Sequence, residues 1–279
     1  MSDSFLKQKW LSGTRGKICY FISQQFPGQP TLIFLHGLSA NHTTWLATAQ
    51  ALEKLQFNVL LLDLRGHGHS DKSKQRDLYR WPVFTQDLRE IIRQENLTRV
   101  ILIGYSFGGS IALDYASQYP DSVRGLFIVS ANYLNPLRSK HLSLLTWPAY
   151  GFLSLLAWLL FWQKRKQYYY YNQATARRYW DSTFIGLTTM PLTINFWMLA
   201  EFANLDLSSE LTNINCPTLI VKSQNDSLLS PAEAQDMARQ IKNARIIALE
   251  KNTHFLASRH QDELTEKIID FIKTENLCA

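Results

Sequence analysis

The stretch RVILIGYSFGGSIALDYA, residues 99–116, constrains the fold of this 279-residue chain more than any other. It opens with a short apolar run typical of a buried strand, and apolar residues recur at helical spacing in its second half. Between the two, Ser106 has one glycine two positions before it and another two positions after it. Such a turn reverses the backbone sharply, with glycine where a side chain would clash with the neighbouring strand or helix. The pattern predicts an α/β fold that presents the Ser106 hydroxyl at the carboxyl end of a sheet.

Ser106 is predicted to be a nucleophile. The amide of the next residue, Phe107, is expected at a helix N-terminus, where unpaired N–H groups favour a developing negative charge. A phosphate-binding loop and a purely structural turn are the alternatives. The Walker lysine and the GxGxxG spacing typical of phosphate loops are both missing around Ser106. Attack on a carbonyl carbon is therefore the favoured interpretation.

Short apolar runs alternate with longer helical patterns along most of the chain. The expected strands are 17–23, 31–35, 59–62, 100–103, 123–129, 218–222 and 245–249. The expected helices are 44–55, 81–95, 110–118, 232–241 and 261–274. Before the fourth helix, Ser230 is placed to cap it and Pro231 suits its first position. Because continuously apolar strands suit parallel pairing under two layers of helices, the alternation predicts an α/β doubly wound, mostly parallel sheet.

The alternation stops after residue 129 and resumes near Cys216. The intervening residues 133–211 have an all-helical, densely aromatic pattern, which we interpret as a helical cap or lid inserted into one core. The α/β core is then made of residues 1–132 and 212–279. No internal repeat or low-complexity linker suggests another arrangement.

One window inside the expected cap, residues 142–162, is uncharged and long enough to cross a bilayer. Pro148 and Gly151 lie within it, and strands are expected on both sides, so a span would divide one fold between two sides of a membrane. We therefore expect the window to form the cap core, to line an acyl pocket or to contact a membrane surface peripherally. In the last case, the basic residues 164–166 would meet anionic head groups.

The net charge and the cysteine content limit which partners, metals and cellular compartments are expected. The net charge of +6 is mild and basic residues occur only in short groups, so nucleic acid is not an expected partner. Cys19, Cys216 and Cys278 lie far apart without metal-ligand spacing, which predicts reduced thiols and no metal. The N-terminal residues lack the apolar core of a signal peptide, so a cytoplasmic protein is expected.

A serine hydroxyl needs a histidine base and an orienting acid to become a strong nucleophile. His254 follows the last expected strand by a short loop, which brings it to the sheet edge that carries Ser106. Asp226 follows the preceding strand in the same way. Asp63 also follows a strand, but it opens the turn DLRGHGHS, where its carboxylate is expected to hold the backbone and Arg65. We predict the catalytic residues Ser106, Asp226 and His254, with a surface-loop role for His254 as the alternative.

The negative charge that develops on an attacked carbonyl oxygen needs two N–H donors. The backbone N–H of Phe107 is the first candidate. The second is expected from the loop His36-Gly37-Leu38 after the strand 31–35, and we assign it to the Leu38 N–H, with Gly37 providing room. Each such donor contributes roughly 3–4 kcal/mol of transition-state stabilisation.

Together these motifs resemble the α/β-hydrolase superfamily. The resemblance rests on FLHGLS, DLRGHGHSD, GYSFGG, QNDSLLSP and NTHF, in the family's order, and covers nearly all of the chain except the cap. It implies an eight-stranded sheet and an acyl-enzyme, with His254 taking the Ser106 proton and Asp226 fixing the imidazole tautomer. It implies no cofactor and no metal. Ser106 at the nucleophile position differs from the aspartate that epoxide hydrolases and haloalkane dehalogenases have at that position.

Four functions are consistent with these residues. The leading hypothesis is an esterase or lipase that cleaves an ester of an apolar acyl group, either a small molecule or a lipid. The second is a thioesterase or carbon–carbon bond hydrolase with the same triad, and the basic pair Arg177-Arg178 would suit the latter. The third is an acyltransferase, and the fourth is a non-catalytic ligand receptor on the same fold. The complete triad argues against the receptor.

Overall fold

The computed structural model describes residues 5–11, 13, 15–135, 146–160, 190–251 and 253–278. Eight strands form one sheet in the order β1-β2-β4-β3-β5-β6-β7-β8. The strands are β1 (Lys7–Leu11), β2 (Ile18–Ser23), β3 (Thr31–Leu35), β4 (Asn58–Leu62), β5 (Val100–Tyr105), β6 (Val123–Val129), β7 (Thr218–Ser223) and β8 (Ala244–Leu249). The pairs β1–β2 and β2–β4 are antiparallel, and all the others are parallel. The expected α/β doubly wound, mostly parallel sheet is confirmed.

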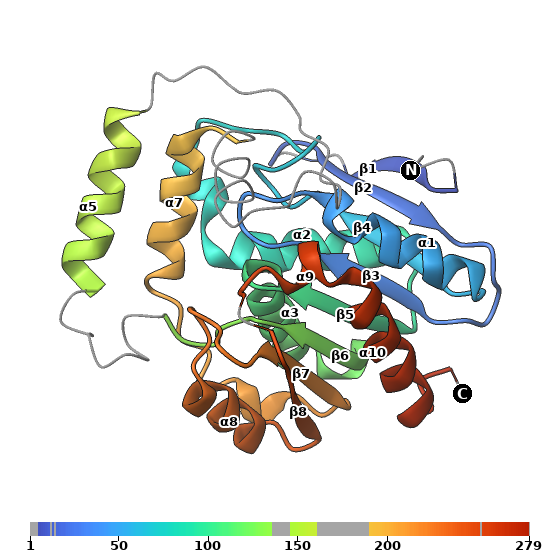
Figure 1. Ribbon diagram of the computed structural model, residues 1–279. Coiled ribbons are helices and arrows are strands. Elements are labelled where there is room, and N and C mark those ends of the chain that lie inside the picture. The colour runs from blue at the N-terminus through green and yellow to red at the C-terminus, as the bar shows by residue number, and fades with distance from the viewer. Residues whose placement is uncertain are drawn as a thin grey trace.

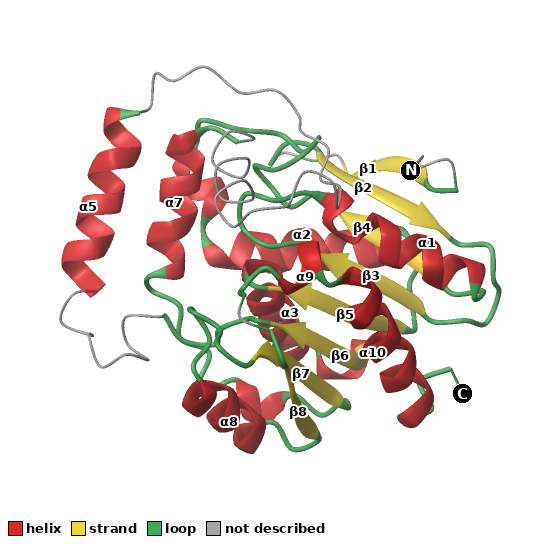
Figure 2. Ribbon diagram, viewed as in Figure 1, coloured by secondary structure: helices red, strands yellow, loops and turns green. Residues whose placement is uncertain are grey.

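Helices cover both faces of this sheet (Figures 1 and 2). The α-helices are α1 (Leu46–Lys54), α2 (Trp81–Gln94), α3 (Phe107–Gln118), α5 (Thr146–Leu159), α7 (Leu192–Phe202), α8 (Pro231–Gln240), α9 (Leu256–Arg259) and α10 (Gln261–Thr274). Side chains of α2, α3 and α8 belong to one hydrophobic core and those of α1 and α10 to a second. The sheet therefore separates two cores, as a doubly wound fold requires.

The alternation of side chains along each strand explains the two cores. Ile33 and Leu35 of β3 belong to the first core, whereas Leu32 and Phe34 belong to the second. Every residue of β3, β4 and β5 is buried. Because successive side chains of a strand point to opposite faces, a strand covered on both faces must be apolar at every position.

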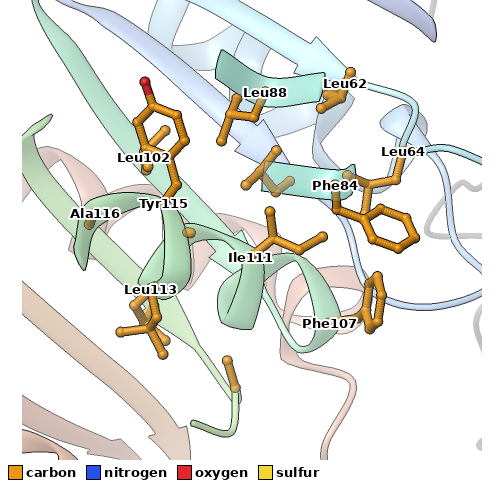
Figure 3. Packing of buried hydrophobic residues seen from close by; sticks show 14 of the residues in the cluster. Leu62, Leu64, Phe84, Leu88, Leu102, Phe107, Ile111, Leu113, Tyr115 and Ala116 are labelled. Carbon is orange, nitrogen blue, oxygen red and sulfur yellow. The ribbon is translucent and has the colours of Figure 1, made fainter. Parts of the chain in front are cut away.

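Helix α3 packs across the first core immediately after the Ser106 turn. Ile111 and Tyr115 lie among buried side chains of the strands and of α2, as Figure 3 shows. At the first turn of the helix, the ring of Phe107 meets Phe84 of α2 edge-on at a centroid distance of 5.2 Å. This packing fixes the start of α3, and with it the backbone beside Ser106.

The structure corrects two details of the predicted elements and confirms a third. Strand β1 at the sheet edge was not predicted, because most of its side chains are solvent-accessible and it lacks an apolar run. Helix α3 begins at Phe107 rather than at residue 110. The predicted cap of α8 is confirmed, since the Ser230 hydroxyl accepts the Glu233 N–H at 3.1 Å.

Helices α5 and α7 lie between β6 and β7, so the described part of the expected cap is helical. The chain leaving β6 and the chain returning from α7 pair with each other at Leu134 and Asp206. Two backbone hydrogen bonds flank this bridge, from Leu207 N to Tyr133 O at 2.9 Å and from Asn135 N to Leu205 O at 2.8 Å. The insertion is thereby closed at its base, while its bounds at residues 133 and 211 stay a prediction.

Helix α5 covers the middle of the uncharged window 142–162 and is 14 residues long. Over the ranges described above, no helix has the length and apolar character needed to cross a membrane. The basic residues 164–166 and the pair Arg177-Arg178 lie outside the described residues.

Candidate active site

The turn between β5 and α3 holds Ser106 in an unusual backbone conformation, with φ 50° and ψ −120°. Its N–H donates to Val129 O of the neighbouring strand at 2.9 Å, which fixes the turn to the sheet. A Cβ on Gly104 would lie 2.5 Å from Gly109 Cα, and a Cβ on Gly108 would lie 2.4 Å from His36 O. Because these neighbours are backbone atoms that cannot move aside, the close packing of the turn requires both glycines.

His254 lies against Ser106. The loop after β8 brings its Nε2 to 3.0 Å from the Ser106 Oγ, within hydrogen-bond distance. The ring is largely buried beside the ring of Tyr105, whose hydroxyl donates to the His254 carbonyl oxygen at 3.2 Å. A base in direct contact with a serine hydroxyl is the arrangement that can remove its proton.

Asp226 orients the histidine from the other side. Its Oδ1 lies 2.9 Å from His254 Nδ1 and also accepts the N–H groups of Leu228 and Leu229 at 2.9 and 3.1 Å. Burial acts to raise the pKa of Asp226, but the hydrogen bond and charge of His254 and the Leu228 N–H outweigh it and lower that pKa below its ordinary value. The ionised carboxylate favours a proton on Nδ1, which leaves the Nε2 lone pair facing the Ser106 hydroxyl.

The loop of residues 36–39, which we call the oxyanion loop, lies next to the Ser106 turn. A Cβ on Gly37 would lie 3.4 Å from Ser106 Cβ and 2.9 Å from the Tyr105 ring. The N–H of Leu38 and the N–H of Phe107, the first residue of α3, donate to no backbone or side-chain acceptor among the described residues. Both groups remain candidates for an oxyanion hole, as the sequence predicts.

Two buried histidines that the sequence analysis did not use attach the oxyanion loop to the turn after β4. His36 Nδ1 lies 2.8 Å from Gly37 O, while its Nε2 accepts the Leu64 N–H at 3.1 Å. His67 Nε2 accepts the Ser39 N–H at 3.0 Å. Burial lowers the pKa of His36 to about 4, an effect that the nearby carboxylate of Asp63 only partly offsets. Burial also lowers the pKa of His67, so both rings are neutral and each can accept an amide N–H.

Asp63 is a structural residue, although not entirely in the way the sequence suggests. Its oxygens accept the backbone N–H of His42 and of His69, each at 2.8 Å, and they also contact both rings at 2.9 and 3.1 Å. The prediction that Asp63 would hold Arg65 is wrong. Arg65 instead forms two 2.8 Å bonds with Asp87 of α2, a long-range partner that the local motif does not reveal.

Cys19, Asp63 and His69 are of metal-ligating types, and their ligand atoms lie within 4.8 Å of one another. The Asp63 oxygens already accept hydrogen bonds in this cluster. Burial raises the pKa of the Cys19 thiol to about 12, and the Cys19 sulfur accepts a hydrogen bond from the Gln8 side-chain amide at 3.3 Å. We attribute the cluster to packing of the turn after β4. Cys19 and Cys216 are buried free thiols and Cys278 is an exposed one.

Comparison with known proteins gives this geometry its context. A sequence profile of the alpha/beta hydrolase fold matches residues 30–260. An uncharacterized protein of Mycobacterium tuberculosis (strain ATCC 25618 / H37Rv) is 34% identical over 102 residues, which cover 37% of this chain but only 29% of that protein. Epoxide hydrolase 4 of Homo sapiens is 23% identical over a match that covers 92% of this chain and 76% of the human protein.

Solved structures share the fold at lower sequence identity. The crystal structure of a putative lipase from Acinetobacter baumannii AYE matches with a TM-score of 0.74 at 22% identity, covering 98% of this chain and 93% of that chain. The profile match extends from the start of β3 to the loop that carries His254 and beyond, well over half of the chain. This chain belongs to the α/β-hydrolase fold family.

Proposed function

We propose that the protein is a serine hydrolase that cleaves esters of apolar acyl groups through an acyl-enzyme on Ser106. The observation that carries this proposal is the 3.0 Å contact between Ser106 Oγ and His254 Nε2. His254 takes the hydroxyl proton as Ser106 attacks the ester carbonyl, and the oxyanion accepts the N–H groups of Leu38 and Phe107. The protonated His254 then gives its proton to the departing alcohol. In the second half-reaction, His254 removes a proton from water as the water oxygen attacks the acyl carbonyl. His254 then returns this proton to Ser106 Oγ as the acyl–oxygen bond to Ser106 breaks, which releases the acid and restores Ser106.

The apolar packing that joins the insertion to the nucleophile turn is consistent with an apolar acyl group, with the Phe107 ring itself buried in this packing. Its ring lies 5.3 Å from Trp81, 5.2 Å from Phe84 and 6.1 Å from Phe202, measured between ring centroids. These aromatic side chains come from α2 and from α7 of the insertion, so the residue after the nucleophile is surrounded by apolar groups from both parts of the chain. The similarity to a putative lipase is consistent with such a substrate.

The serine itself distinguishes this proposal from epoxide hydrolysis, despite the similarity to a human epoxide hydrolase. An epoxide hydrolase of the family uses a carboxylate nucleophile, whereas position 106 offers a hydroxyl whose attack on a carbonyl gives an acyl-enzyme. Thioesters, carbon–carbon bonds and acyl transfer to an acceptor other than water are the competing reactions of the same triad. A receptor without catalysis is the alternative of a different class.

We further propose that α5 makes peripheral contact with a lipid surface of a cytoplasmic membrane face. Trp147 and Trp158 of this uncharged helix are 76% and 70% exposed, and Phe152 is 60% exposed. Tryptophan favours the membrane interface, where its ring is buried and its N–H stays hydrated. This contact would bring a lipid ester to the protein, and the sequence places the basic residues 164–166 shortly after the helix.

A substrate panel tests the reaction class. The purified chain is assayed on aryl esters with acyl chains of two to sixteen carbons, beside the matching thioesters and monoacylglycerols. We expect turnover of the esters, with preference for the longer acyl chains, and no turnover by Ser106→Ala. Faster cleavage of thioesters than of esters, relative to the uncatalysed rates, would contradict the ester assignment.

A further inference from the structure

Helix α7 of the insertion makes a polar contact with the oxyanion loop. The Asn195 side-chain amide donates from Nδ2 to the Ser39 hydroxyl oxygen. Asn195 is only 2% exposed, and Ser39 is half-buried. A hydrogen bond shielded from water in this way holds a defined geometry, because breaking it leaves a buried polar group without a partner.

The backbone of the oxyanion loop is strained at Ser39, so contacts that stabilise this residue also stabilise the loop. Its φ of 62° lies in the left-handed region, which a residue with a side chain adopts at a cost. His67 holds its N–H from the core at 3.0 Å, and Asn195 holds its hydroxyl from the insertion. Ser39 directly follows Leu38, so its position determines where the Leu38 peptide lies.

Helix α7 is docked firmly enough to serve as a reference for this loop. Ile194 and Met198 lie so close to Gly66, in the turn after β4, that a Cβ on the glycine would be 2.9 and 2.8 Å from their methyl groups. Trp197 packs against Tyr79 at a ring distance of 5.7 Å. At its C-terminal end, α7 places Phe202 beside Phe107. The helix therefore contacts both segments that carry the candidate oxyanion donors.

We propose that Asn195 is a positioning residue for ester hydrolysis. Through Ser39 it fixes the peptide that carries the Leu38 N–H, so the insertion helps to set the geometry of the oxyanion hole as well as covering the site. This inference rests on the proposed function, because an oxyanion hole has a role only if a carbonyl is attacked. It also explains why a buried amide is found on a helix face that is otherwise apolar.

The expected effect is selective. An oxyanion donor must lie about 2.7–3.1 Å from the oxygen, and complete loss of one lowers kcat by about 10²–10³-fold. Loss of the Asn195 contact leaves the Leu38 N–H in place but less well held, so Asn195→Ala should lower kcat by about tenfold. KM for a short, soluble aryl ester should change less than twofold, because the donor binds the transition state more strongly than the ester.

The control for loss of an asparagine side chain is Asn204→Ala, at a position that is exposed where Asn195 is buried. Asn204 follows α7, and among the described residues its side-chain amide bonds only to Ala200 O at 3.1 Å, within its own helix end. It tests the loss of an asparagine side chain from the same part of the insertion. We expect kcat to be unchanged in this control.

Phenylboronic acid gives a readout that a merely structural role would not change. It forms a tetrahedral adduct on an activated serine that resembles the oxyanion intermediate. Asn195→Ala should weaken its binding by the same factor as kcat, while Asn204→Ala should not. Ser39→Ala should weaken boronate binding at least as much as Asn195→Ala, and the double variant should lose no more than Ser39→Ala alone, since Ser39→Ala already removes the acceptor of the Asn195 amide.

Hydrogen exchange is a second measurement that does not depend on catalytic activity. The peptide containing residues 36–41 should exchange several-fold faster in Asn195→Ala than in Asn204→Ala, because the Ser39 N–H would be less well held. Unchanged exchange, unchanged boronate affinity, or multiplicative losses in the double variant would overturn the inference. A wild-type protein without Ser106-dependent activity would instead overturn the proposed function. The exchange result would then still decide whether Asn195 holds the loop.

Discussion

His254 Nε2 lies 3.0 Å from Ser106 Oγ although the two residues are 148 positions apart in the chain. They meet because each follows a parallel strand of the same sheet, Ser106 at the end of β5 and His254 beyond β8. Asp226 follows β7 and completes the arrangement from the opposite side of the imidazole. Three loops at the carboxyl ends of β5, β7 and β8 thus place the His254 base, oriented by the Asp226 carboxylate, beside the Ser106 hydroxyl.

The first prediction concerns the nucleophile. Ser106→Ala should lower kcat by up to about 10⁶-fold, because residues of a triad act as a unit. The thermal unfolding midpoint should stay close to that of the wild type, since only one hydroxyl at the site is removed. If more than a few per cent of the activity persists, another residue is the nucleophile.

The second prediction separates the two buried aspartates. Asp226→Asn should lower kcat by about 10³-fold or more with little loss of stability, because an amide can donate to His254 Nδ1 and stabilise the wrong tautomer. Asp63→Asn should instead lower the free energy of unfolding by about 3–5 kcal/mol, because Asp63 accepts backbone N–H groups and contacts two histidine rings. The opposite pattern, with activity lost on changing Asp63 and kept on changing Asp226, would reassign the acid.

Sequence patterns were sufficient to place the catalytic candidates because the carboxyl ends of parallel strands lie on the same side of the sheet. Asp226 and His254 needed only the position of the preceding strand, and Ser106 needed only its glycines. The edge strand β1 escaped prediction because Lys7, Gln8 and Lys9 resemble a solvated segment and pair only with β2. A short polar strand at an edge carries no apolar signal.

Contacts between side chains that are far apart in the chain could not be predicted from local sequence patterns. The pairing of Arg65 with Asp87 and the bond from Asn195 to Ser39 join segments that no spacing rule connects. His36 and His67, which attach the oxyanion loop to the turn after β4, leave a signal in the sequence, because FLHG and RGHG each place a histidine next to a glycine. What they bind depends on how β3 and β4 bring the two turns together.

The third prediction concerns pH and the oxyanion loop. In the folded protein the pKa of His36 is lowered from 6.5 to about 4, so below pH 6.5 the unfolded chain binds a proton that the folded chain does not. The free energy of unfolding should therefore fall between about pH 6.5 and pH 4, by up to about 3 kcal/mol from this residue. The lowered pKa of Asp226 acts in a different window, below its ordinary value of 3.8.

The variant His36→Gln isolates this contribution, because other titrating groups remain in both proteins. Denaturant unfolding at several pH values should show a shallower loss of stability in the variant than in the wild type. Parallel curves would mean that His36 is not held neutral by burial.

The fourth prediction concerns α5 and lipid. The wild type should bind vesicles of phosphatidylcholine and phosphatidylglycerol with a blue shift of its tryptophan fluorescence. Trp147→Ala and Trp158→Ala should each weaken this binding by about tenfold, because each removes a large apolar side chain from the interface. Trp10→Ala is the matched control, since Trp10 is 40% exposed but lies on β1.

Equal binding by all three tryptophan variants, or no binding at low salt, would contradict the proposal that α5 contacts a lipid surface. The exposed side chains of α5 would then need another explanation, and a soluble ester would become the favoured substrate. The catalytic proposal would be unaffected, because it rests on Ser106, Asp226 and His254.

The most direct test of the central claim is to identify the residue that becomes acylated. The chain is mixed with an activated aryl ester, quenched in acid within the first turnover and analysed by peptide mass spectrometry. We predict one acyl group per molecule on the peptide that carries Ser106, none in Ser106→Ala, and strongly slowed acylation in His254→Ala. Ester cleavage with no acyl group on Ser106, or an acyl group on any other residue, would contradict this account.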